Sequence, residues 1–154
     1  MDDVAAQAGV GVGTVYRHFP TKTALMGALV AQKFSEFAAN ARDAYDQSDD
    51  PWESFATAFR RNAVLMAEDA GVQYVLMNIP NLLEYIEPQK AELDDAMNRL
   101  IRRAKRAGAL RKDFEMQDFG MVMCGLCSTM CAPVDFNWRR HLDILMDGLR
   151  EPRR

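Results

Sequence analysis

Residues 3–25, DVAAQAGVGVGTVYRHFPTKTAL, predict two short helices joined by a turn that contains glycine. Gly9 ends the first helix, because glycine tolerates the positive φ that a sharp turn requires. We expect Val10 to be the apolar residue that pins the two crossed helices together. Val15 and Phe19 lie four residues apart on the second helix and are expected to face this pin.

Four side chains of the second helix then point outward, namely Thr14, Tyr16, Arg17 and His18. Hydroxyl and guanidinium groups suit phosphate oxygens, and a recognition helix places its N-terminal half against base edges in the major groove. The pattern therefore predicts a helix-turn-helix that reads DNA.

The stretch GVGVGTVYRHFPTKTAL resembles the signature of the tetracycline-repressor-like (TetR) family of transcriptional regulators, which runs roughly G-V-x-x-G-T-L/V-Y-x-x-F-x-S/T-K-x-x-L. The fixed positions are met by Gly9, Val10, Gly13, Thr14, Val15, Tyr16, Phe19, Thr21, Lys22 and Leu25. The resemblance implies an all-α fold in which a helix-turn-helix precedes a helical ligand-binding and dimerisation domain. It places the DNA-facing residues at Val12, Gly13, Thr14, Tyr16, Arg17, His18 and Lys22. Thr21 can cap the helix that Lys22 begins, and the positive end of that helix attracts a phosphate.

The resemblance also implies a head of three helices, the first of which would precede Asp3. Only Met1 and Asp2 stand there, so we expect an incomplete head in which Val4, Ala8, Val15 and Phe19 lose apolar surface to pack against. A truncated chain, a misassigned internal start and a natural variant are the alternatives, and we favour the first two.

Composition and motifs indicate where the protein resides and whether it is an enzyme. The chain has 154 residues, of which 49% are hydrophobic, and no apolar run long enough to cross a bilayer. Without a signal peptide or a secreted cysteine framework, we expect a cytoplasmic protein. The only histidines are His18 and His141, and no nucleophile elbow, phosphate loop or HExxH motif is present, so we expect neither an enzyme nor a cofactor.

We divide the chain into a helix-turn-helix over 1–24, a connecting helix over 25–47 and a ligand-binding and dimerisation domain over 48–154. The connecting helix is amphipathic, with apolar residues that step by three or four. Asp50 is expected to cap the next helix, with Pro51 in its first turn. Gly71 is expected to break that helix.

The remaining segments are also helical by pattern. A shorter apolar helix is expected over 72–83, where Pro80 ends or kinks it. Three more are expected over 87–108, over 119–130, and after a cap at Asp135 or Asn137.

The last two helices are expected to form a homodimer interface. Trp138, Leu142, Leu145 and Leu149 alternate steps of four and three, as in a coiled-coil seam, and the preceding helix is apolar on more than one face. The family resemblance implies that these helices pair with their copies across a two-fold axis. Such a dimer predicts a palindromic operator with half-sites about 34–36 Å apart, or a multiple of that spacing. The alternative is that both helices complete the core of one chain.

The middle helices carry aromatic and thioether side chains that suit an adaptable pocket. The family resemblance implies an effector site here, and the candidates are Phe55, Phe59, Met66, Tyr74, Met77, Asn78, Tyr85, Met97 and Met123. Tyr74, Asn78 and Tyr85 are the candidate polar anchors for an apolar or aromatic compound. Each position is also consistent with ordinary core packing.

Two other clusters have structural and functional interpretations. Cys124, Cys127 and Cys131 share nearly one helical face and could bind a metal or sense oxidants, but we favour ordinary burial and expect no metal. The basic stretch comprises Arg99, Arg102, Arg103, Lys105, Arg106, Arg111 and Lys112. We interpret it as a solvated helix face rather than an anion site.

The sequence therefore predicts a DNA-binding regulator, with repression from a palindromic operator and release by a small effector as the expected activity. The alternative is a helical ligand-binding or interaction protein that no longer binds DNA.

Overall fold

The computed structural model describes residues 1–80 and 82–151, with the side chains of Met77 and Leu83 outside the description. The described residues form α-helices and one short 3-10 helix, which confirms the all-α prediction. The helices are α1 (Asp2–Ala8), α2 (Val12–His18), α3 (Lys22–Gln47), α4 (Pro51–Ala67), α5 (Ala70–Asn78), η1 (Leu82–Tyr85), α6 (Glu87–Arg106), α7 (Met116–Met130) and α8 (Trp138–Leu149).

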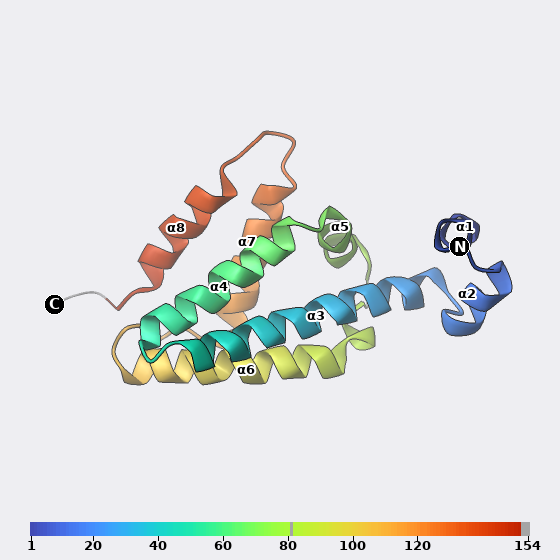
Figure 1. Ribbon diagram of the computed structural model, residues 1–154. Coiled ribbons are helices and arrows are strands. Elements are labelled where there is room, and N and C mark those ends of the chain that lie inside the picture. The colour runs from blue at the N-terminus through green and yellow to red at the C-terminus, as the bar shows by residue number, and fades with distance from the viewer. Residues whose placement is uncertain (81, 152–154) are drawn as a thin grey trace.

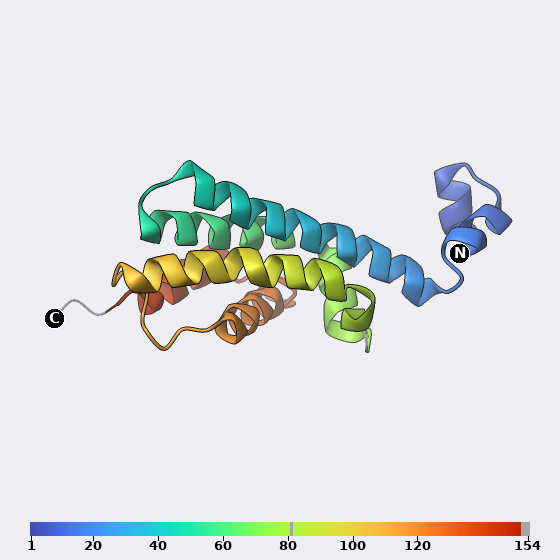
Figure 2. The same ribbon diagram turned by 90° about the horizontal axis from the view of Figure 1, so that it is seen from below.

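The long helix α3 connects a small head to a larger body. Helices α1 and α2 stand at one end of the molecule, and the C-terminal end of α8 lies at the other (Figures 1 and 2). In the body α3 packs against α4 and α6, and α7 covers α4 and α6. Helix α8 packs on α7, at the edge of the body (Figure 1). The predicted dimer seam of α8 is wrong, because its apolar residues pack on the core of the same chain; they are Trp138, Leu142, Leu145 and Leu149. The head is thus attached to the body mainly through the first turns of α3.

The core of the body is aromatic at its centre. Phe55 and Phe59 on α4 are fully buried, and their rings meet Phe114 and Phe119 at centroid distances of 5.6 and 4.9 Å. Both pairs are edge-to-face, the arrangement that the quadrupoles of aromatic rings favour. These contacts join α4 to α7 and to the loop before it.

Side-chain caps start the helices where the sequence predicts them. Thr21 Oγ1 accepts a hydrogen bond from Ala24 N at 3.0 Å. Asp50 Oδ1 accepts from Trp52 N and Glu53 N at 2.8 and 2.9 Å. Asn137, rather than Asp135, caps α8. Each cap satisfies a backbone N–H that has no partner inside the helix, which contributes about 1 kcal/mol.

Two predictions about the middle of the chain are wrong. Gly71 does not break the helix: α4 ends at Ala67, and Asp69 caps α5 by accepting from Val72 N at 2.9 Å, so Gly71 lies within α5. The bounds expected for the next helix, 72–83, are also wrong, since α5 spans Ala70–Asn78, although it does end just before Pro80 as predicted. Ile79 precedes a proline and is extended, because the proline ring disfavours helical backbone at the preceding residue.

Some residues of the basic stretch bind the C-terminal end of α3 and the N-terminal end of α7. The guanidinium of Arg103 donates to the carbonyls of Tyr45 and Ser48 at 3.0 and 2.8 Å, which satisfies the C-terminal end of α3. Arg99 lies 4.4 Å from the centroid of the Tyr45 ring. Lys105 pairs with Glu115 at 2.7 Å. The interpretation of the whole stretch as a solvated face is therefore wrong for Arg99, Arg103 and Lys105, which contact other parts of the body.

Helices α7 and α8 are also linked by a polar contact. Thr129 donates its hydroxyl proton to the Gly125 carbonyl at 3.0 Å, so its oxygen accepts from His141 Nδ1 at 2.8 Å. None of the helices in the described residues combines the length and apolar character needed to cross a membrane.

Candidate functional site

The head is a helix-turn-helix whose two helices meet through small side chains. Gly9 has φ of +66°, in the left-handed region, as the turn prediction requires. Ala5 and Val15 are buried between α1 and α2. Val10, in the turn between them, is 45% exposed and does not act as the predicted pin. Val15 is 7% exposed, so it does not lose the burial that an incomplete head was expected to cost it. Val4, by contrast, is exposed, so the head leaves apolar surface in solvent.

Helix α2 presents the predicted DNA-facing residues to solvent. Five of them are exposed and Thr14 is half-buried; the exposed ones are Val12, Gly13, Tyr16, Arg17 and His18. Lys22 is exposed on the first turn of α3, directly after the cap at Thr21. The structure therefore brings all seven residues to α2 and the adjoining end of α3, with Arg17 and Lys22 as the permanent positive charges.

The predicted effector-site residues divide into two groups. Phe55, Phe59, Met66, Met97 and Met123 belong to one continuous buried core. In that core they contact protein side chains on several helices, as close-packed interiors do.

The other candidates lie at the surface. Tyr74 is 62% exposed and Tyr85 is 51% exposed, and Asn78 is exposed with its amide Nδ2 donating to the Tyr74 carbonyl at 2.8 Å. The structure does not bring these three side chains to the buried group. The side chain of Met77 lies outside the described residues.

One polar residue near this region was missed by sequence reasoning. Gln73 on α5 is 2% exposed, and its Nε2 donates to the Met66 carbonyl at 2.6 Å. Its Oε1 accepts from Cys131 Sγ at 2.7 Å. This amide ties α5 to the end of α4 and to the end of α7. A single glutamine among apolar residues gave no periodic signal from which its burial could be inferred.

The cysteines of α7 differ sharply in environment. Cys124 and Cys131 are exposed, whereas Cys127 is buried. Burial, and to a smaller extent the neighbouring thiols, raises the pKa of Cys127 to about 11. Among the described residues, no group of three or more His, Cys, Asp or Glu side chains is placed to hold a metal ion.

This difference predicts selective alkylation. At pH 8, and at a protein concentration low enough to keep the chain monomeric, we expect iodoacetamide to modify Cys124 at least about tenfold faster than Cys127. The thiolate is the nucleophile, and a raised pKa keeps Cys127 protonated below pH about 11. Peptide mass spectrometry after timed quenching measures both rates. In urea the two cysteines should react alike. Equal rates in the folded protein would contradict the burial of Cys127.

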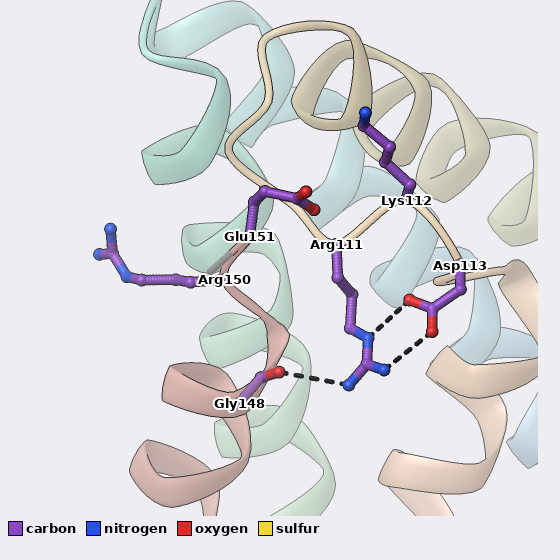
Figure 3. Close-up of a pocket in the computed structure, with 6 residues that line it drawn as sticks. All are labelled: Arg111, Lys112, Asp113, Gly148, Arg150 and Glu151. Carbon is purple, nitrogen blue, oxygen red and sulfur yellow. Dashed lines mark hydrogen bonds and ion pairs between the residues drawn. The ribbon is translucent and has the colours of Figure 1, made fainter. Parts of the chain in front are cut away.

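A shallow hollow of about 360 Å³ lies at the end of the body remote from the head, lined by Arg111, Lys112, Asp113, Gly148, Arg150 and Glu151. Arg111 donates to both oxygens of Asp113 at 2.6 and 2.8 Å and holds the pKa of that carboxyl below its usual range. Lys112 and Arg150 point away from Arg111 (Figure 3). The charges do not converge on one point, so the hollow lacks the arrangement of an anion site.

Comparison with known proteins agrees with the head and with the body. Residues 1–29 match the family described as bacterial regulatory proteins, tetR family. Residues 50–151 match the family described as the C-terminal domain of SbtR-like transcriptional regulators. The HTH-type transcriptional regulator SAR0097 of Staphylococcus aureus (strain MRSA252) is 44% identical over 43 residues, which are 28% of this chain and 22% of that protein.

Solved structures share the whole architecture. The TetR transcriptional regulator SCO0520 from Streptomyces coelicolor has a TM-score of 0.65 at 25% identity, over 99% of this chain and 87% of that one. A TetR transcription regulatory protein from Mycobacterium vanbaalenii has a TM-score of 0.62 at 27% identity, over 97% of this chain and 81% of that one. With its head and most of its body matched to this family, the chain belongs to the TetR family of transcriptional regulators.

Proposed function

We propose that this protein binds operator DNA through α2 as a two-fold dimer and that a small effector changes its affinity for that DNA. One observation carries the DNA-binding part: α2 is held by the buried Val15 and turns Tyr16, Arg17 and His18 to solvent beside the capped N-terminus of α3. Side chains of this kind on one exposed helix suit the major groove, and the N-terminus of α3 suits a phosphate.

Substitutions at Lys22 and Arg17 test this assignment. Lys22→Ala should weaken binding almost uniformly across sequences and reduce the slope of log K against log salt by about one. Arg17→Ala should cost about 1–3 kcal/mol on the preferred sequence only, if its guanidinium reaches a base. The measurement is fluorescence anisotropy on the promoter region of its own gene and on random duplex, across a salt series.

Lys33 provides a matched control for these substitutions. It lies on α3 away from the head and pairs with Glu36 at 2.9 Å, so Lys33→Ala removes the same charge without affecting the proposed contact. Equal losses on both DNAs for Arg17→Ala would reassign Arg17 to a phosphate. No binding by the unsubstituted protein at low salt would favour the alternative of an interaction protein without DNA affinity.

The surface of α7 supports the dimer. Its exposed residues carry no charge along about three turns, and they are Gln117, Gly120, Met121, Cys124, Gly125 and Ser128. Next to α7, Val134, Phe136 and Ile144 are each more than half exposed. An exposed helix face without charge, with large exposed apolar side chains near it in the sequence and on α8, suits a protein interface. A second copy related by a two-fold axis would cover it and give the two recognition helices that a palindromic operator requires.

The effector is expected to be apolar or aromatic, because Phe55, Phe59, Met66, Met97 and Met123 give the body an interior of aromatic rings and thioethers. Tyr74, Asn78 and Tyr85 remain the proposed polar anchors. Binding there requires the surface helices α5 and η1 to move toward or away from the core, and such a ligand shifts DNA affinity only if it prefers one of the two positions.

A thermal-shift screen tests the class of effector. Apolar and aromatic compounds at about 100 times their dissociation constant should stabilise the protein by about 2.7 kcal/mol, which raises its melting temperature by several degrees. Polar cations serve as the comparison set. Stabilisation by the cations alone would overturn the assignment to an apolar effector.

A further inference from the structure

We propose that η1 fixes the position of the N-terminal part of α3. Tyr85 contacts the backbone of α3 at Gly27, where no side chain intervenes, and the position of η1 thereby sets the direction in which α3 carries the head. This inference rests on the proposed function only for its consequence, the control of DNA affinity. The contact itself is a property of the fold.

The contact depends on the missing side chain of Gly27. Gly27 is buried in α3, and a Cβ added there would lie 2.8 Å from Tyr85 Cβ and 3.2 Å from Tyr85 Cγ. Real Cβ atoms essentially never approach a neighbour to 2.8 Å, and 3.2 Å is tighter than nine in ten real Cβ contacts. Tyr85 Cβ is bonded to its own backbone and cannot rotate away. Glycine is unfavourable inside a helix, so its place here is explained by this close approach.

Neighbouring residues hold η1 firmly against α3. Leu82 at the start of η1 is 3% exposed, and Ile86 directly after Tyr85 is fully buried. These two anchors leave Tyr85 little freedom to retreat. Helix α5 precedes η1 in the chain, and its Gln73 forms hydrogen bonds with the Met66 carbonyl and with Cys131. A displacement of α5 and η1 is therefore passed to α3 at Gly27.

The head follows the first turns of α3. Helices α1 and α2 pack chiefly on each other, and they stand clear of the body at the end of α3 (Figures 1 and 2). Gly27 precedes the deeply buried part of α3, which runs from Val30 to Ala44, and lies about 7 Å along the axis from Lys22. The contact at Gly27 therefore lies between the head and the most deeply buried part of α3.

The experiment is hydrogen exchange by mass spectrometry on the whole protein, with and without Gly27→Ala. Alanine is the better helix former, so a position without a tight contact should show slower exchange in α3. The contact predicts the opposite sign: exchange about tenfold faster in residues 12–26 and 82–86. Gly148→Ala is the control, since a Cβ there meets nothing within 4 Å, and it should leave both segments unchanged.

Two double variants identify Tyr85 as the cause. Gly27→Ala with Tyr85→Ala keeps the Cβ at 2.8 Å and should still exchange fast. Gly27→Ala with Tyr85→Gly removes all three atoms near the added methyl and should match Tyr85→Gly alone. If Gly27→Ala fails to fold, restored folding in the second double variant supports the contact, and failure of both variants overturns it.

Unchanged or slower exchange in residues 12–26 for Gly27→Ala would overturn the proposal, as would fast exchange that persists with Tyr85→Gly. DNA-binding measurements on the same variants distinguish a failure of the proposed DNA binding from a failure of the proposed contact between η1 and α3. If the unsubstituted protein shows no affinity for its promoter region, the proposed function fails while the exchange result stands. If it binds DNA and Gly27→Ala changes exchange but not DNA affinity, the contact between Tyr85 and Gly27 does not set the orientation of the head, and the proposal fails.

Discussion

Phe59→Ala is expected to lower the free energy of unfolding by about 3–5 kcal/mol. The side chain is fully buried, and its ring meets those of Phe55 and Phe119 at 5.8 and 4.9 Å. Truncation removes its burial energy and leaves a cavity that the surrounding helices only partly fill. Domains are stable by about 5–15 kcal/mol, so urea unfolding followed by circular dichroism should show a large fall in the midpoint.

Val64→Ala is the matched control, because Val64 is on the same helix, 38% exposed, and alanine is well tolerated there. Its effect should stay within about 0.5 kcal/mol. A loss below about 1 kcal/mol for Phe59→Ala would contradict tight packing at this site. It would indicate a loosely filled interior of the kind that an effector could enter.

Met121→Arg is expected to convert the proposed dimer to a monomer at micromolar concentration. Met121 is 57% exposed near the middle of the uncharged face of α7, where a two-fold axis would bring two copies of the new charge together. A buried unpaired charge costs several kcal/mol, and an interface loses tenfold in affinity for every 1.4 kcal/mol. Sedimentation equilibrium of the two proteins measures the change.

Tyr74→Arg adds the same charge at a similarly exposed apolar residue on α5 and should leave the mass unchanged. A dimer that survives Met121→Arg would place the interface elsewhere. A dimer lost with Tyr74→Arg would move it to α5. Loss of the dimer should also weaken operator binding, since each protomer supplies one recognition helix.

The errors of sequence reasoning share a physical origin. Gly71 was expected to break a helix on its backbone freedom alone, but the cap at Asp69 starts α5 before it. Val10 was expected to be buried, but it lies exposed in the turn, and Ala5 and Val15 are the buried residues of α1 and α2. In both cases a local preference did not decide the outcome, since the surrounding structure overrides such preferences.

Local chemistry in the sequence determined the helices of the head, the glycine turn at Gly9, the caps at Thr21 and Asp50, and the family to which the chain belongs. These features arise within a few residues, so spacing and residue type suffice to predict them. Only the tertiary structure decided that Gln73 is buried, that Tyr74 is separated from Phe59, and that Tyr85 rests on Gly27. These contacts join residues distant in the chain, and their existence depends on how whole helices pack.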